Sequence, residues 1–123
     1  MQISSNEINA LGQILQTGWG KGSSPDHITC SMHGDTLTLK YMTIVYFAEE
    51  RALRAQSEMV SHESIEKLAK CVKDMKAQFK EMTGKALKVK EISNSDSIEL
   101  IAATNLSPRK VAYYRRNVVL QLA

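Results

Sequence analysis

The stretch from Ala48 to Thr83 contains neither glycine nor proline, and it limits the possible folds of this chain more than any other feature. Residues that favour helices dominate it, so it predicts one long helix that ends at Gly84. Apolar residues within it follow at spacings of 3, 4, 3, 4 and 3, which is the a/d seam of an amphipathic helix. The seam consists of Ile65, Leu68, Val72, Met75, Phe79 and Met82. We expect these side chains to organise the core, each stabilising it by about 1.5–3 kcal/mol when fully buried, unless the seam forms a coiled coil with another chain.

An earlier apolar stripe in the same stretch is out of register with this seam. It runs through Ala48, Ala52, Ala55 and Met59. Because the two stripes would face different directions on one continuous helix, we expect a kink or a break across residues 57–64.

The N-terminal segment carries the signals of a short helix over residues 5–17. Ser4 and Glu7 have the spacing of a capping box, in which each side chain bonds the backbone N–H of the other residue. Gly18 ends the pattern, and a glycine-rich loop follows. This loop contains a Gly-Lys pair, but a phosphate-binding loop needs a preceding strand and a Ser or Thr after the lysine. We therefore interpret it as a connector.

Period-2 alternation predicts a β-hairpin over residues 28–41, with one face towards water. A turn at residues 33–35 separates its two strands. Its apolar face holds Ile28, Cys30, Met32, Leu37, Leu39 and Tyr41. Residues 42–47 have apolar side chains on both faces, so they either extend the second strand or lead into the long helix.

The segment after Gly84 has two interpretations. Alternation near its start and the run 111–122, rich in Val and Tyr, favour strands. Ser107 and Pro108, in contrast, form a good N-cap and N1 pair for a helix, which favours a helix-turn-helix over residues 98–122. We take the strands as the main prediction and keep the helix-turn-helix as the alternative.

The composition of the chain is that of one soluble domain. It has 123 residues, of which 43% are hydrophobic and 24% charged, and it is too short for two domains. We expect a single α+β domain over residues 1–123: a short N-terminal helix, a β-hairpin, and a long amphipathic helix packed on an antiparallel sheet that C-terminal strands complete. No apolar run could span a membrane and the N-terminus lacks the features of a signal peptide, so we expect assembly in the cytoplasm.

Residues that could carry chemistry form no known catalytic or metal-binding pattern. His27, Cys30 and His33 are ligand types, but on a strand Cys30 points away from the two histidines. Cys30 and Cys71 are far apart in the sequence, and we expect free thiols rather than a disulfide. We find no nucleophile elbow, zinc-protease helix or isolated apolar carboxylate. The sequence therefore predicts a non-enzyme without metal or cofactor.

The net charge of +3 conceals an asymmetry along the chain. Residues 1–66 carry four Lys or Arg and eight Asp or Glu, a net of −4, whereas residues 67–123 carry twelve and five, a net of +7. Two explanations remain open: one end meets an acidic partner, or copies assemble head to tail through opposite charges.

Basic and aromatic residues gather after Pro108, and we predict that they contact a partner. They are Arg109, Lys110, Tyr113, Tyr114, Arg115 and Arg116. Arg and Tyr are enriched in protein interfaces, and they also stack on nucleotides. We favour a protein interface and keep nucleic acid as the second possibility.

Two parts of the sequence resemble known families. Residues 106–111 and 114–118 resemble the recognition-helix region of LuxR/GerE-type helix-turn-helix regulators, which implies that Arg109, Lys110 and Arg115 face DNA. The order of elements and the closing segment 111–116 are similar to small virion structural proteins of tailed bacteriophages. That resemblance implies repeated copies in a head, neck or tail assembly of the virion, and no catalysis.

These observations lead to one predicted function and one alternative. We predict a structural protein that self-associates or docks in a larger complex, with copies of itself or larger structural proteins as partners and no membrane. The alternative is a DNA-binding helix-turn-helix regulator that uses residues 98–122.

Overall fold

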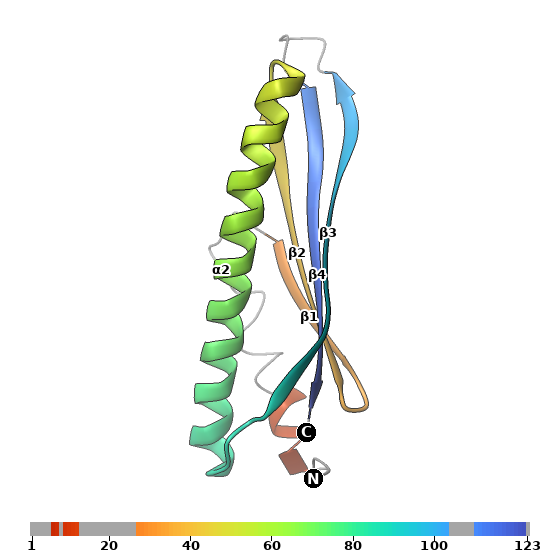
Figure 1. Cartoon of the computed structure of the whole chain (residues 1–123). Coiled ribbons are helices and arrows are strands. Elements are labelled where there is room, and N and C mark those ends of the chain that lie inside the picture. The colour runs from red at the N-terminus through yellow and green to blue at the C-terminus, as the bar shows by residue number, and fades with distance from the viewer. Residues whose placement is uncertain (1–5, 8, 13–26, 104–109, 123) are drawn as a thin grey trace.

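The computed structural model describes residues 6–7, 9–12, 27–103 and 110–122 and shows an α+β fold (Figure 1). Its elements are β1 (His27–His33), β2 (Thr36–Phe47), α2 (Glu50–Thr83), β3 (Val89–Ala103) and β4 (Lys110–Leu122). Residues 6–7 and 9–12 are helical, where the short N-terminal helix is expected. The capping residue Ser4 and the glycine-rich loop lie outside the described residues. The predicted fold class is confirmed.

The four strands form one antiparallel sheet in the order β1-β2-β4-β3. β1 and β2 form the predicted hairpin, and its two-residue turn contains Gly34 at φ +60°, a conformation that only glycine adopts without strain. Residues 42–47 extend β2. β4 pairs with β2 on one side and β3 on the other, so the C-terminal strand lies inside the sheet.

The described C-terminal residues are strands, as the main prediction states. Every second side chain from Ala112 to Leu122 is buried, which is the period of a strand with one covered face. The helix-turn-helix alternative for residues 98–122 is therefore wrong for its described residues, since 98–103 belong to β3 and 110–122 form β4. Helical spacing of Val111, Tyr114 and Val118 is weak evidence, because tertiary pairing decides the structure of short Val- and Tyr-rich runs.

The core lies between α2 and one face of the sheet. Alternate residues of β2 and β4 face the helix, and Leu11 of the N-terminal helical segment joins them. From the helix, Leu68, Met75 and Phe79 are buried and Val72 packs against them. These four residues confirm the middle of the predicted seam.

The two ends of the predicted seam are exposed, which corrects the prediction at Ile65 (47% exposed) and Met82 (50%). A straight α-helix rotates by about 20° per heptad relative to a strict a/d repeat. Supercoiling around a partner helix would absorb this rotation, but α2 packs on a sheet. The first and last seam residues therefore turn away from the core.

α2 continues without a break through residues 57–64, so the expected kink or break is wrong. Ser57 Oγ donates to the Leu53 carbonyl at 2.6 Å, and Ser64 Oγ donates to the Ser61 carbonyl at 2.7 Å. Such bonds satisfy the hydroxyls inside the helix, and the backbone stays helical across both serines. The helix ends at Gly84, as expected, with φ +72° and its N–H bonded to the Lys80 carbonyl at 2.8 Å.

α2 runs along the sheet over β2 and β4 and leaves β3 beside it (Figure 1). Every side chain of β3 from Lys90 to Ile101 is exposed. β3 is also a sheet edge, with register irregularities at Glu91/Ser93 and Leu100/Ala102. The sheet therefore has a covered side around β2 and β4 and an open side at β3.

Candidate interaction surface

A buried arginine marks the boundary between the covered and the open side. Arg116 is 6% exposed and projects from β4 towards α2. Its Nε donates to Ser64 Oγ at 2.7 Å, and one terminal nitrogen donates to Ser61 Oγ at 2.7 Å and Asp96 Oδ2 at 3.2 Å. A buried guanidinium costs free energy unless it is paired and hydrogen-bonded, and here helix and strand supply the partners together.

Two further residues complete this network, which we call the Arg116 network. The Tyr114 hydroxyl accepts from Arg116 at 2.9 Å and donates to Asp96 Oδ2 at 3.0 Å, while Arg116 donates to Asn94 Oδ1 at 2.5 Å. The network joins α2, β4 and β3 through side chains. It explains why two serines, Ser61 and Ser64, occupy helix positions that face the sheet.

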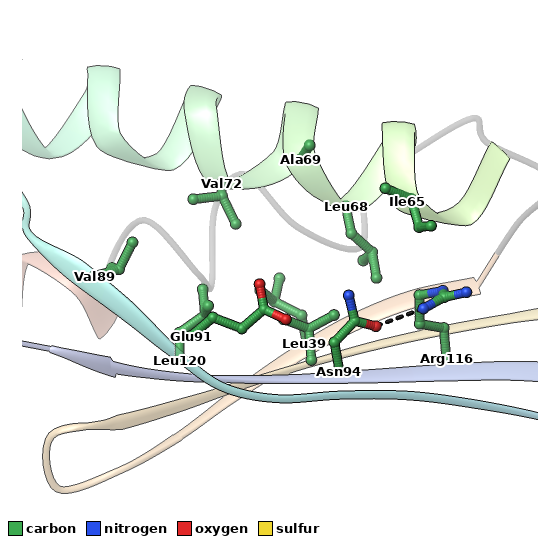
Figure 2. A pocket seen from close by; sticks show the side chains of 11 residues that line it. Leu39, Ile65, Leu68, Ala69, Val72, Val89, Glu91, Asn94, Arg116 and Leu120 are labelled. Atoms are coloured by element: carbon green, nitrogen blue, oxygen red, sulfur yellow. Dashed lines mark hydrogen bonds between the residues drawn. The ribbon is translucent and has the colours of Figure 1, made fainter. Parts of the chain in front are cut away.

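Next to the Arg116 network, a hollow of about 360 Å³ opens between α2 and β3 (Figure 2). Its walls are mainly aliphatic, and Figure 2 shows Leu68 and Val72 pointing from α2 towards the sheet. Glu91 and Asn94 project into it from β3, and the dashed line marks the bond from Arg116 to Asn94. The hollow is an apolar trough with a polar end.

A second hollow, of about 410 Å³, continues this trough towards the start of α2. Ile65 lines both hollows, and Asp96 and Ser61 line the second. We call the two together the α2–β3 groove. On the inner face of β3, Ile98 and Leu100 (58% exposed) stand uncovered beside Asp96. The groove thus combines exposed aliphatic side chains with a backbone edge that no other described strand pairs with.

Charge divides α2 and β3 along their lengths. Residues 50–66 of the helix carry two Lys or Arg against four Asp or Glu, and residues 67–83 carry five against two. On β3, Lys90 and Glu91 balance each other near the start, whereas the acidic Asp96 and Glu99 lie further along the strand. The asymmetry found in the sequence is therefore a gradient along the open side.

The predicted contact residues separate onto two faces of β4. Tyr114 and Arg116 are buried under α2, which corrects their assignment to an interface. Because β-strand side chains alternate, Tyr113 and Arg115 point to the opposite, uncovered face. The Arg115 guanidinium lies 5.2 Å from the centre of the Tyr113 ring and pairs with Glu99 at 2.7 Å.

The other predicted contact residues lie near the start of β4 or before it. Lys110 is 3.7 Å from a carboxylate oxygen of Glu50, and Arg109 lies outside the described residues. On the same uncovered face, Ile44 and Tyr46 of β2 are exposed. This end of the outer sheet face is a second surface with exposed apolar side chains.

Both cysteines are free and partly buried, as expected for thiols outside a disulfide. Burial, together with the electrostatic interaction with Cys71, raises the pKa of the Cys30 thiol to about 12. Burial and the charge of Asp74 raise the pKa of Cys71 to about 11. Thiols that stay protonated at neutral pH are poor nucleophiles.

The histidines show no shared site in the described part of the chain. His33 is exposed at the hairpin turn, and His62 pairs with Glu66 at 3.1 Å on the surface of α2. Among the described residues, no three His, Cys, Asp or Glu side chains lie close enough together to hold a metal ion. The lysines of the second half of α2 are exposed, except that Lys67 is partly covered with its ammonium 5.9 Å from the Tyr41 ring.

Sequence reasoning missed the Arg116 network and the open strand. The alternation of β4 carries the signal for the network, because it places Arg116 on the same face as Ala112, Tyr114 and Val118. An arginine on an apolar face requires a buried acceptor, and the serines of α2 and Asp96 are the candidates. The position of β3 at a sheet edge depends on strand order, which no local pattern determines.

Comparison with known proteins does not assign this chain to a family. Among the described residues, no helix has the length and apolar character needed to cross a bilayer. No family model matches the chain, and neither a curated protein nor a solved structure shows significant similarity to it.

Proposed function

We propose that this chain is a non-enzymatic structural protein that acts by self-association or by docking in a larger assembly. The observation that carries the proposal is β3, a strand of 15 residues at the sheet edge whose exposed side chains include Ile98 and Leu100. A long edge strand presents a row of N–H and C=O groups that another strand can satisfy.

The composition of the open side supports a binding surface. Proteins commonly protect edge strands with charges, bulges or short length. β3 has bulges near both ends, but the stretch from Ser93 to Leu100 between them is regular and pairs residue by residue with β4. Its polar side chains are mostly small, and its inner face carries aliphatic residues beside the aliphatic α2–β3 groove.

The polar groups of the groove support binding rather than catalysis. Asp96, Ser61 and Arg116 hydrogen-bond one another, so their donors and acceptors hold α2, β3 and β4 together. The proposal therefore gives the Arg116 network a structural role: it keeps β3 in place while leaving its outer edge and inner face accessible.

The resemblance to small virion structural proteins of tailed bacteriophages suggests the setting of this proposal. Such a setting requires many copies and favours surfaces that bind further copies. A charge gradient along α2 and β3 is useful there, because it selects one relative orientation of neighbouring copies.

Multi-angle light scattering across a wide concentration range tests the proposal. We expect the mass to rise above the 13.7 kDa of one chain as the concentration increases, or on addition of co-purifying proteins. A strict monomer at near-millimolar concentration that also binds none of them would contradict the proposal. A mobility shift of DNA at low salt would contradict a function limited to protein contacts.

A further inference from the structure

We propose that the partner of β3 is β3 of a second copy, paired antiparallel around a two-fold axis at Ser95. The inference rests on the self-association proposed above and identifies its interface. The two four-stranded sheets would join into one continuous sheet, with both long helices on the same face. An edge-to-edge pair of this kind is isologous, since the same residues contribute from both copies.

The choice of β3 over the other edge follows from burial and length. β1 has 7 residues, and Ile28, Cys30 and Met32 pack against the core. β3 has 15 residues and exposes its side chains from Lys90 to Ile101. Pairing at β3 would therefore cover surface that the single chain leaves open, whereas β1 has little apolar surface left to cover.

The register follows from the requirement that opposite residues of an antiparallel pair face the same side. In the regular stretch, Ser93, Ser95 and Ser97 face outward, and Asn94 and Asp96 face the helix side. An axis at Asp96 would place two carboxylates opposite each other. An axis at Asn94 would bring Asp96 against the Glu91 bulge, again with like charges. An axis at Ser95 instead pairs Asn94 with Asp96 and Ser93 with Ser97.

The same axis also matches charges beyond the regular stretch. At the bulge, two residues of β3 count as one position, as they do against β4. Lys90 of one copy then lies opposite Glu99 of the other, and Val89 lies opposite Leu100. Because of the two-fold symmetry, each of these two contacts occurs twice in the dimer. An axis at Ser97 moves Lys90 away from Glu99 and places Asn94 against Leu100.

The helices support the antiparallel arrangement as well. Both copies of α2 would lie on one face and run in opposite directions, separated by the two β3 strands. The acidic first half of one helix and the basic second half of the other would then lie at the same end of the dimer. Charge complementarity thus favours a second copy over an unrelated strand.

Disulfide trapping of full-length variants tests this arrangement. In Ser95→Cys the two introduced thiols would lie opposite each other, within the Cα separation that a disulfide spans. Ser93→Cys is the matched control, because the two copies of residue 93 would be about 13 Å apart along the strands. Native Cys30 and Cys71 react slowly because their thiol pKa values are raised to about 12 and 11. The wild type under the same oxidation measures their contribution.

We expect Ser95→Cys to form covalent dimers at least about ten times faster than Ser93→Cys, and a mixture of Ser93→Cys and Ser97→Cys to form the mixed dimer. Light scattering of the reduced variants distinguishes failure of the β3 pairing from failure of the proposed self-association. Dimers in solution with equal or no trapping at 93 and 95 would overturn the β3 pairing but keep self-association. Trapping by a co-purifying protein instead of a second copy would also overturn it. A monomer at every concentration would overturn the β3 pairing, and it would overturn both proposals if the chain also binds no co-purifying protein.

Discussion

The two edge strands of the sheet, β1 and β3, differ in length and in how far their side chains are buried. At β1, Ile28 and Met32 pack against the core, and the strand is short. At β3, a strand about twice as long leaves Ile98 and Leu100 partly exposed, although the Arg116 network bonds the strand to β4 and α2. Stability and exposure are therefore separable: a strand can be fixed by polar contacts on one side and remain available for pairing on the other.

The covered side carries most of the stability, which leads to the largest expected effect. Phe79→Ala removes a buried aromatic side chain, so we expect the free energy of unfolding to fall by about 3–5 kcal/mol. Met82→Ala at the next seam position is the control, and we expect it to cost less than about 1 kcal/mol because Met82 is half exposed. Urea unfolding measures both. Equal losses would mean that the covered side extends to the end of the seam.

The Arg116 network lies at the boundary between the covered and the open side of the sheet. Its disruption should cause the second largest loss in the free energy of unfolding. Asp96→Asn removes the charge that balances Arg116 and keeps the shape of the side chain, so we expect a loss of about 1–3 kcal/mol. Glu99→Gln removes the carboxylate of the exposed pair with Arg115 and serves as control, with a loss of about 0.2–1 kcal/mol. If both variants unfold at the same urea concentration, Arg116 does not depend on Asp96.

The thiols of the covered side predict a pH dependence. Their pKa is raised in the folded state above the ordinary value of 9.0, so the stability they contribute is complete below pH 9 and decreases as pH rises towards 11 and 12. We expect the free energy of unfolding under reducing conditions to fall between pH 8 and 10, by well under about 1 kcal/mol per thiol, because both thiols are partly exposed and solvent screens part of the shift. Cys30→Ala should show a smaller fall. An identical pH profile for both proteins would place Cys30 in contact with water.

The smallest expected effect comes from changing a charge on the open side. It weakens dimer formation rather than folding. Lys90→Glu should place two carboxylates at each end of the paired β3 strands and weaken the dimer by about tenfold, with little change in the stability of the single chain. Lys88→Glu changes the net charge equally just outside the strand and should have a smaller effect. Sedimentation at two salt concentrations measures both, and equal weakening would point to net charge alone.

Much of this fold is predictable from local pattern. The hairpin, the long helix and its end at Gly84 follow from alternation, the lack of glycine and proline, and a left-handed cap. The exposure of Ile65 and Met82 does not follow, because it depends on whether the seam packs on a helix or on a sheet. The continuous helix at Ser61 and Ser64 was also unpredictable from the stripe shift, since these two serines bond Arg116, a buried residue far along the chain.

The interaction surface was less predictable than the fold. Tyr113 and Arg115 face outward, whereas Tyr114 and Arg116 face inward, and composition alone cannot separate the two pairs. Strand order places β4 inside and β3 at the edge, and strand order is a long-range property. For this reason the open strand, which carries the proposed function, had no local signature.

Hydrogen exchange of the backbone amides at increasing protein concentration tests the central claim most directly. β3 and β1 are compared in the same sample, so each edge is the control for the other. We predict that amides of residues 93–97 which do not bond β4 gain protection as the concentration rises, while those of β1 stay unchanged. Protection that appears at β1, or only on the outer face of β2 and β4, would contradict the assignment of β3 as the associating edge.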